Sequence, residues 1–128
     1  MTTLFELLNF VVTTLQTSSI VENTRVVETI QFSEAQFSLK VRAHLASGEI
    51  LQVRIYQNGK HVDYAYQLLQ EDKPLIRWDN KEHFRNISTF PNHFHNNKGS
   101  VENSPLCGDP FEDLTLALTQ CHELHSRG

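Results

Sequence analysis

The stretch "FSLKVRAHLASGEILQVRIYQNGKHVDYAYQL", residues 37–68, decides the fold because its apolar residues recur at every second position. Such alternation is typical of strands that pack one face on a core and turn the other to solvent. We therefore predict three antiparallel strands here. The expected inward residues are Phe37, Leu39, Val41, Ala43, Leu45, Leu51, Val53, Ile55, Val62, Tyr64, Tyr66 and Leu68.

The turns inside this stretch predict how the strands pair. Asn58-Gly59 is the strongest two-residue hairpin signal in the chain, and a turn there would place Ile55 opposite Val62. A loop over residues 47–49 would align Leu45 with Leu51. Both pairings put apolar side chains on one shared face.

Weaker strand signals flank the three strands. "RVVETIQF", residues 25–32, is expected to point Ile30 and Phe32 inward. After the "EDKP" corner, a fifth strand would set Leu68 opposite Ile76 and Tyr66 opposite Trp78. The expected sheet is a five-stranded antiparallel meander.

The predicted register gathers positive charge on the polar face. Arg42 would lie opposite Arg54, and Arg54 opposite Asp63. Like charges across a ladder are destabilising, so an anion is needed nearby. Asp63 could supply it, or the stripe of Lys40, Arg42 and Arg54 could bind the phosphates of a substrate or an acidic partner surface.

Helices are predicted at both ends. Thr3 and Glu6 form a capping box before a helix over residues 4–16. Asp109 and Pro110 suit the start of a second helix. Its apolar stripe would comprise Phe111, Leu114, Leu118, Cys121 and His125. The predicted fold class is α+β: an N-terminal helix, the five-stranded meander, a histidine-rich loop and a C-terminal helix.

The bulk properties limit the class of protein. With 128 residues the chain fits a single domain, residues 1–128, and its net charge of -4 argues against coating nucleic acid by bulk attraction. We expect a cytoplasmic protein, because the two cysteines form no paired motif and we recognise neither a signal peptide nor an apolar run long enough to span a membrane. The sequence contains no nucleotide-binding glycine motif, and we expect no cofactor.

The segment after the meander concentrates reactive side chains. Three of the seven histidines, His83, His93 and His95, follow a strand that carries Arg77 and Asp79. Two imidazoles can serve as base and acid near neutral pH. This set predicts a catalytic site for metal-independent RNA cleavage.

Other chemistry fits the same segment. Arg85 and Lys98 could contact the substrate by stabilising charge on phosphoryl oxygens, beside Arg77. The H-x-H of His93 and His95 could instead bind a metal ion. A purely structural interpretation also stands, in which Asp79 and Asn80 end the strand in a turn and the histidines bond to nearby backbone.

Four separated anchors carry a resemblance. "YAYQLL", "LIRWDN", His83 and "TFPNHFH", within residues 64–95, resemble the TumE-like toxins, small proteins of prokaryotic toxin–antitoxin modules. Asn92 stands where these proteins commonly carry a histidine. The resemblance implies a toxin neutralised by direct binding of a helix-turn-helix antitoxin. A non-catalytic module that binds a partner protein is the alternative.

Overall fold

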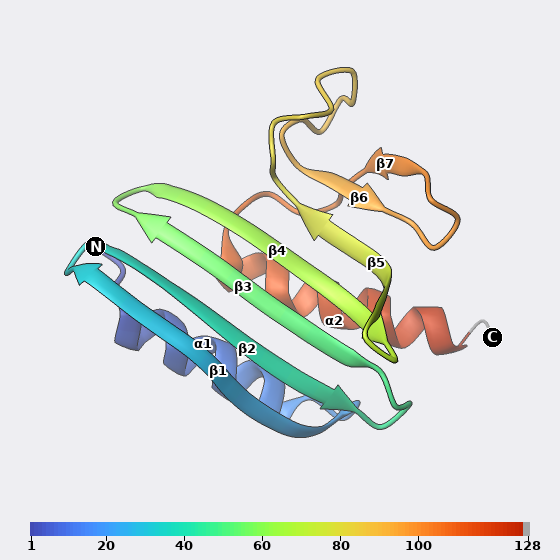
Figure 1. Ribbon diagram of the computed structural model, residues 1–128, viewed down its shortest axis with the longest axis horizontal. Helices are drawn as coiled ribbons and strands as arrows, with labels where there is room; N and C mark the ends of the chain where they lie inside the picture. Colours follow the sequence, from blue (N-terminus) through green and yellow to red (C-terminus); the bar gives the residue numbers. More distant parts are fainter. Residues whose placement is uncertain (127–128) are drawn as a thin grey trace.

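The computed structural model describes residues 1–126, the last two by their backbone alone. Within that range, strands β1 to β7 form one antiparallel sheet in sequence order (Figure 1). The elements are α1 (Leu4–Thr17), β1 (Val21–Ser33), β2 (Gln36–Leu45), β3 (Ile50–Asn58), β4 (His61–Gln70), β5 (Lys73–Asp79), β6 (His93–His95), β7 (Val101–Asn103) and α2 (Pro110–Ser126). The predicted α+β class is confirmed.

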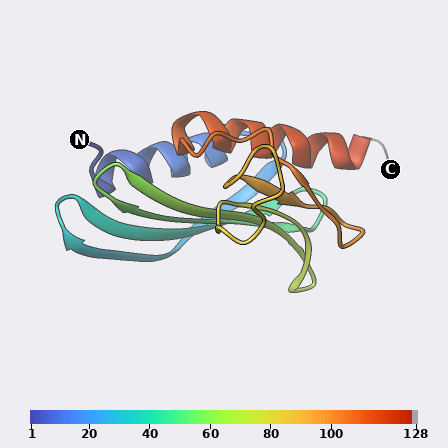
Figure 2. The ribbon, with the colours of Figure 1, turned by 90° about the horizontal axis from the view of Figure 1, so that it is seen from above.

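Both helices cover the same face of the sheet and leave the other face open (Figure 2). The inward residues predicted for β2 and β3 are all buried, as are Tyr64, Tyr66 and Leu68 of β4. Val62 is only partly buried and packs at the margin of the core. The alternating pattern thus identified which face carries the core.

The predicted helix starts are confirmed. Thr3 Oγ1 accepts a hydrogen bond from the Glu6 amide at 3.1 Å, and α1 buries Leu7, Val11 and Leu15. At the start of α2, Asp109 Oδ1 accepts from the Phe111 amide at 3.0 Å. The core residues of α2 are Leu114, Ala117, Leu118 and Cys121, whereas Phe111 is exposed and the side chain of His125 lies outside the described part.

Two predictions about the sheet are wrong. The histidine-rich segment is not a loop throughout, because β6 and β7 extend the five-stranded meander to seven strands among the described residues. Ile30 and Phe32 are exposed by 40% and 61% instead of buried. A register shift between Val26 and Glu28 adds one residue to β1, so the following residues exchange faces.

The predicted registers of the β2–β3 and β3–β4 hairpins are each off by two residues. Gly59 and Lys60, rather than Asn58 and Gly59, form the β3–β4 turn, with Gly59 at a φ of 61°. Ile55 therefore lies opposite Tyr64, and Leu51 opposite Ala43. Because side chains alternate with a period of two, this shift leaves every apolar residue on its predicted face. The β4–β5 pairing, which sets Leu68 opposite Ile76 and Tyr66 opposite Trp78, is confirmed.

The shift does change which polar side chains meet. Arg42 lies opposite Gln52 instead of Arg54, and its Nε donates to Gln52 Oε1 at 2.9 Å. Arg54 lies between Lys40 and Ala65 and not beside Asp63. The predicted compensation of the arginines by Asp63 is therefore wrong.

Candidate active site at the end of strand β5

The side chains of the last three residues of β5 point alternately to the candidate site and to the core. Trp78 points into the core, where it is fully buried and its Nε1 donates to Gln120 Oε1 at 2.8 Å. Arg77 and Asp79 take the opposite side because side chains alternate along a strand. The strand thus presents a guanidinium and a carboxylate on the open face of the sheet.

Asparagine side chains fix the loop that leaves β5. Asn80 Nδ2 donates to the Val62 carbonyl at 2.8 Å, and Asn80 Oδ1 accepts from the Tyr64 amide at 3.1 Å. Asn92 Oδ1 accepts from the Tyr64 hydroxyl at 2.7 Å. Hydrogen bonds therefore attach both ends of the loop to β4. This attachment positions the segment after the loop to pair with β5.

That pairing assembles the site. Strand β6 places His93 opposite Asp79 and His95 opposite Arg77, while Phe94 between them packs against Trp78 with ring centroids 5.2 Å apart. The polar–apolar–polar order of "HFH" is the strand signal that sequence reasoning missed, because three residues are too few to distinguish it from a loop.

Asp79 is the centre of the cluster. Its carboxylate accepts from Arg77 Nε at 2.7 Å and from the Lys81 amide at 3.0 Å, and it lies 2.9 Å from His93 Nε2. His95 Nε2 is 3.6 Å from the same carboxylate. The side chain of Asp79 is only 4% exposed. A buried carboxylate persists only when it is paired and hydrogen-bonded, as it is here.

The two histidines have different environments. His93 is buried, with Nδ1 3.1 Å from the Pro91 carbonyl oxygen and Nε2 facing Asp79. Both neighbours are acceptors, so an imidazolium at His93 would satisfy them with two donors. His95 Nε2 lies 3.1 Å from His93 Nε2. Burial lowers the pKa of His95, Asp79 opposes this effect, and the proximity of His93 and Arg77 adds to it.

His83 lies apart from the other two histidines. It is exposed, and Phe84 separates it from the cluster: the Phe84 ring is 4.8 Å from that of His93 and 5.7 Å from that of His95. All three histidines nevertheless line one hollow of about 290 Å³. We call it the histidine hollow; its lining residues are Arg77, Asp79, Lys81, His83, Phe84, His93 and His95.

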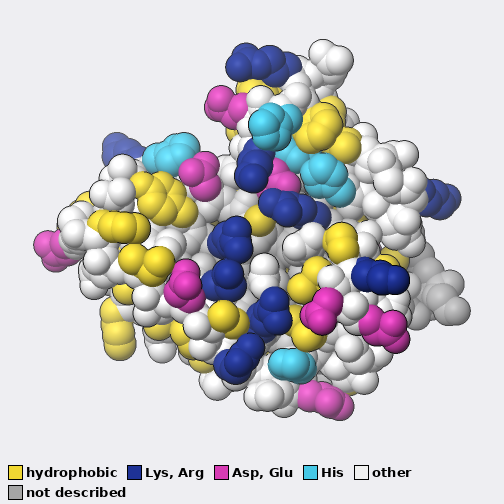
Figure 3. All heavy atoms as spheres, in the orientation of Figure 1, with side chains coloured by type: hydrophobic (Ala, Val, Ile, Leu, Met, Phe, Trp, Pro, Cys, Tyr) yellow, Lys and Arg dark blue, Asp and Glu magenta, His cyan; other side chains and the backbone are white. Residues whose placement is uncertain are grey.

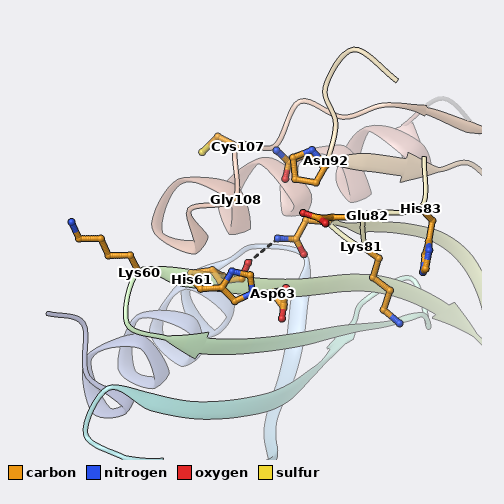
Figure 4. A pocket seen from close by; sticks show the side chains of 12 residues that line it. Lys60, His61, Asp63, Lys81, Glu82, His83, Asn92, Cys107 and Gly108 are labelled. Carbon is orange, nitrogen blue, oxygen red and sulfur yellow. Dashed lines mark hydrogen bonds and ion pairs between the residues drawn. The ribbon is translucent and has the colours of Figure 1, made fainter. Parts of the chain in front are cut away.

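A second hollow of about 670 Å³ adjoins the first (Figure 4). Lys81 and His83 line both, and the second also contains the exposed pair of His61 and Asp63, with Nε2 and Oδ1 3.1 Å apart. His61 lies across this hollow from His83 (Figure 4).

The predicted substrate-binding residues fall into two groups. Lys40, Arg42 and Arg54 lie on the open face of the sheet, where Lys and Arg side chains form a diagonal band that ends beside the histidines (Figure 3). Arg85 and Lys98 do not line the histidine hollow. The guanidinium of Arg85 lies 5.6 Å from the ring centre of Phe90, and Lys98 is exposed in the β6–β7 connection.

The cluster also has the composition of a metal site. One donor atom from each of Asp79, His93 and His95 lies within 4.8 Å of the others. Two imidazole nitrogens and a carboxylate suit zinc or ferrous iron. The contact between His93 Nδ1 and the Pro91 carbonyl would hold the tautomer whose Nε2 can bind a metal.

The fold and the site together define a small α+β protein with a buried carboxylate–imidazole cluster that opens on the uncovered face of its sheet. Residues 11–125 match the family model described as Toxin TumE, and the chain therefore belongs to this family. Membership makes it a toxin component of a toxin–antitoxin system and implies an antitoxin partner. No curated protein and no solved structure matches the chain. None of the helices within residues 1–126 is long and apolar enough to cross a membrane.

Proposed function

We propose that this toxin is a ribonuclease that cleaves RNA in the histidine hollow without a metal ion. The observation that carries the proposal is the half-buried His95, whose lowered pKa keeps its imidazole neutral, beside Arg77 and a buried Asp79–His93 pair. A neutral imidazole can accept a proton at physiological pH. Arg77 is placed to stabilise negative charge on a phosphoryl group.

The exposure of each side chain in the hollow decides the catalytic role that we propose for it. His95 and Arg77 are about one-third exposed and line the hollow, whereas His93 is 2% exposed and cannot reach a substrate. His95 is therefore the base, and His93 and Asp79 are positioning residues that orient it. His83 is exposed on the same hollow and is available as the acid.

The reaction follows from these positions. His95 removes the proton from the ribose 2′-hydroxyl, and the 2′-oxygen forms a bond to phosphorus while the bond from phosphorus to the 5′-oxygen breaks. His83 gives its proton to the departing 5′-oxygen. The products are a 2′,3′-cyclic phosphate and a free 5′-hydroxyl. In-line displacement requires acid and base on opposite sides of the phosphate, a requirement that His93 and His95 in mutual contact could not meet. We therefore assign the acid to His83, which lines the same hollow without contacting His95.

Cleavage of a single-stranded RNA by purified protein in the presence of EDTA tests the proposal. His95→Ala should lower the cleavage rate by about 10²–10⁴-fold, the usual contribution of a general base. His44→Ala is the matched control. His44, on β2, lies on the open face of the sheet as His95 does, but it is outside the hollow. Full activity of the His95 variant would refute the assignment.

We further propose a helix-turn-helix antitoxin as partner and the cytoplasm of a prokaryotic cell as the location. Expression should arrest growth, and co-expression of an adjacent helix-turn-helix gene should restore it. If arrest survives both His93→Ala and His95→Ala, the toxin instead acts as a non-catalytic module that binds a partner protein.

The three convergent donors favour a second candidate, a metal-binding site at Asp79, His93 and His95. It predicts about one equivalent of zinc or iron retained through purification and lost in His95→Ala. Elemental analysis that finds no metal, together with activity in EDTA, would exclude this candidate and favour the acid–base mechanism.

A further inference from the structure

The open face of the sheet carries a cationic band, made up of Arg25, Lys40, Arg42 and Arg54. Arg25 of β1 lies opposite Arg42 of β2, and Lys40 of β2 lies opposite Arg54 of β3. Two like-charged pairs therefore stand side by side on adjacent strands, although such pairs are destabilising. Sequence reasoning missed Arg25, because the register between β1 and β2 was not predicted.

Protein carboxylates do not neutralise the band. Within residues 1–126, none of its four side chains has a carboxylate oxygen within 4.0 Å. Glu28, the register partner of Lys40, is the nearest acid along the ladder but forms no ion pair with it. Like charges that lie opposite each other and form no ion pair with a carboxylate point to an external polyanion.

The register connects the band to the site. One row of paired residues crosses the sheet from Arg25 through Arg42, Gln52, Gln67 and Arg77 to His95. Five steps of about 4.8 Å between strands give a path of about 24 Å. Figure 3 shows Lys and Arg side chains in succession across the uncovered face as far as the histidines. A linear anion that followed it would be led to the base of the proposed reaction.

We propose that the cationic band binds the phosphate backbone of single-stranded RNA and guides it into the histidine hollow. The inference rests on the proposed function for its choice of ligand. An open sheet face with cations in a line is suited to an extended strand whose phosphates repeat at regular intervals. An acidic protein segment also carries negative charge, but nothing in it would require a path that ends at an imidazole base.

Binding is tested with a 2′-O-methyl RNA of about 12 nucleotides, which lacks the attacking hydroxyl and so cannot be cleaved. The variant Lys40→Gln/Arg54→Gln should reduce the slope of log affinity against log salt by about 1.4, because each phosphate contact of a single strand contributes about 0.7. This slope corresponds to about a 25-fold loss of affinity at 0.1 M salt. Lys73→Gln is the control, since Lys73 lies six residues along β5 from Asp79, about 20 Å away.

Folding can be separated from binding in this variant. Removing both charges of the Lys40–Arg54 pair relieves the repulsion between them, so the melting temperature should stay at or above that of the wild type. An unchanged salt slope and affinity would overturn the inference even if the protein cleaves RNA. Tighter binding of polyglutamate than of RNA would also overturn it, in favour of an acidic protein partner.

Substrate length provides an independent test of guidance. Cleavage of a 12-nucleotide RNA should lose kcat/KM in the Lys40→Gln/Arg54→Gln variant, whereas cleavage of a dinucleotide should not, because it is too short to reach the band. Equal losses on both substrates would contradict guidance. If the band binds the uncleavable RNA but the protein cuts no RNA, the ribonuclease proposal fails while the binding site stands.

Discussion

Replacing Asp79 by asparagine is expected to destabilise the protein more than any other change of a single charge at the site. The side chain is 4% exposed and bonds to Arg77, to His93 and to the Lys81 amide. Asparagine keeps the shape and one acceptor oxygen. It loses the charge and turns an amide donor toward groups that are themselves donors.

The magnitude follows from burial. Removing one partner of a buried ion pair costs about 3–5 kcal/mol, since the remaining charge stays in a poorly solvated site. At about 2.1 cal/mol/K per residue, a chain of 128 residues has an unfolding entropy of about 0.27 kcal/mol/K. The melting temperature of Asp79→Asn should therefore fall by about 11–19 °C.

Thermal and urea unfolding of Asp79→Asn beside Asp63→Asn would test this value. Asp63 pairs with His61 on the same face but is 58% exposed, so its loss should cost less than about 1 kcal/mol, or about 4 °C. If the two variants melt within about 4 °C of each other, Asp79 does not hold the cluster together, and the proposed orientation of His95 through it is wrong.

Three further measurements follow from the burial of individual groups. Because the pKa of His95 is lowered, the loss of RNA cleavage on the acidic side of the pH–rate profile of kcat/KM should begin only below the usual histidine range; a loss that begins within that range would contradict His95 as the base. Burial raises the pKa of Tyr64 and Tyr66, so absorbance at 295 nm should report both as unionised at pH 11 while the protein remains folded; their early ionisation would contradict their burial. A thiol reagent such as DTNB should modify one cysteine of the native protein, Cys107, because burial raises the pKa of Cys121 to about 12; two rapid equivalents would show that the core is open.

The catalytic candidates depend on tertiary structure in different degrees. Arg77 and Asp79 could be predicted to share a face, because they are two residues apart on a clear strand. The sequence did not predict that His93 and His95 lie opposite them. Strand β6 has no strong strand signal, and its position depends on the hydrogen bonds of Asn80 and Asn92 to β4. Family resemblance marked the histidines but not their separate environments.

The sequence by itself determined the helix caps, the inward face of β2 to β4 and the family. The helix caps depend on residues a few positions apart. The inward face depends on the alternation of side chains, which a register shift of two residues leaves unchanged. Only the tertiary structure decided that Lys40 faces Arg54, that a shift in β1 exposes Ile30, and that His93 is buried while His95 is half open. The reason is physical: an alternating pattern specifies which side a residue takes, whereas the partner it meets depends on turn geometry and on packing between segments far apart in the chain.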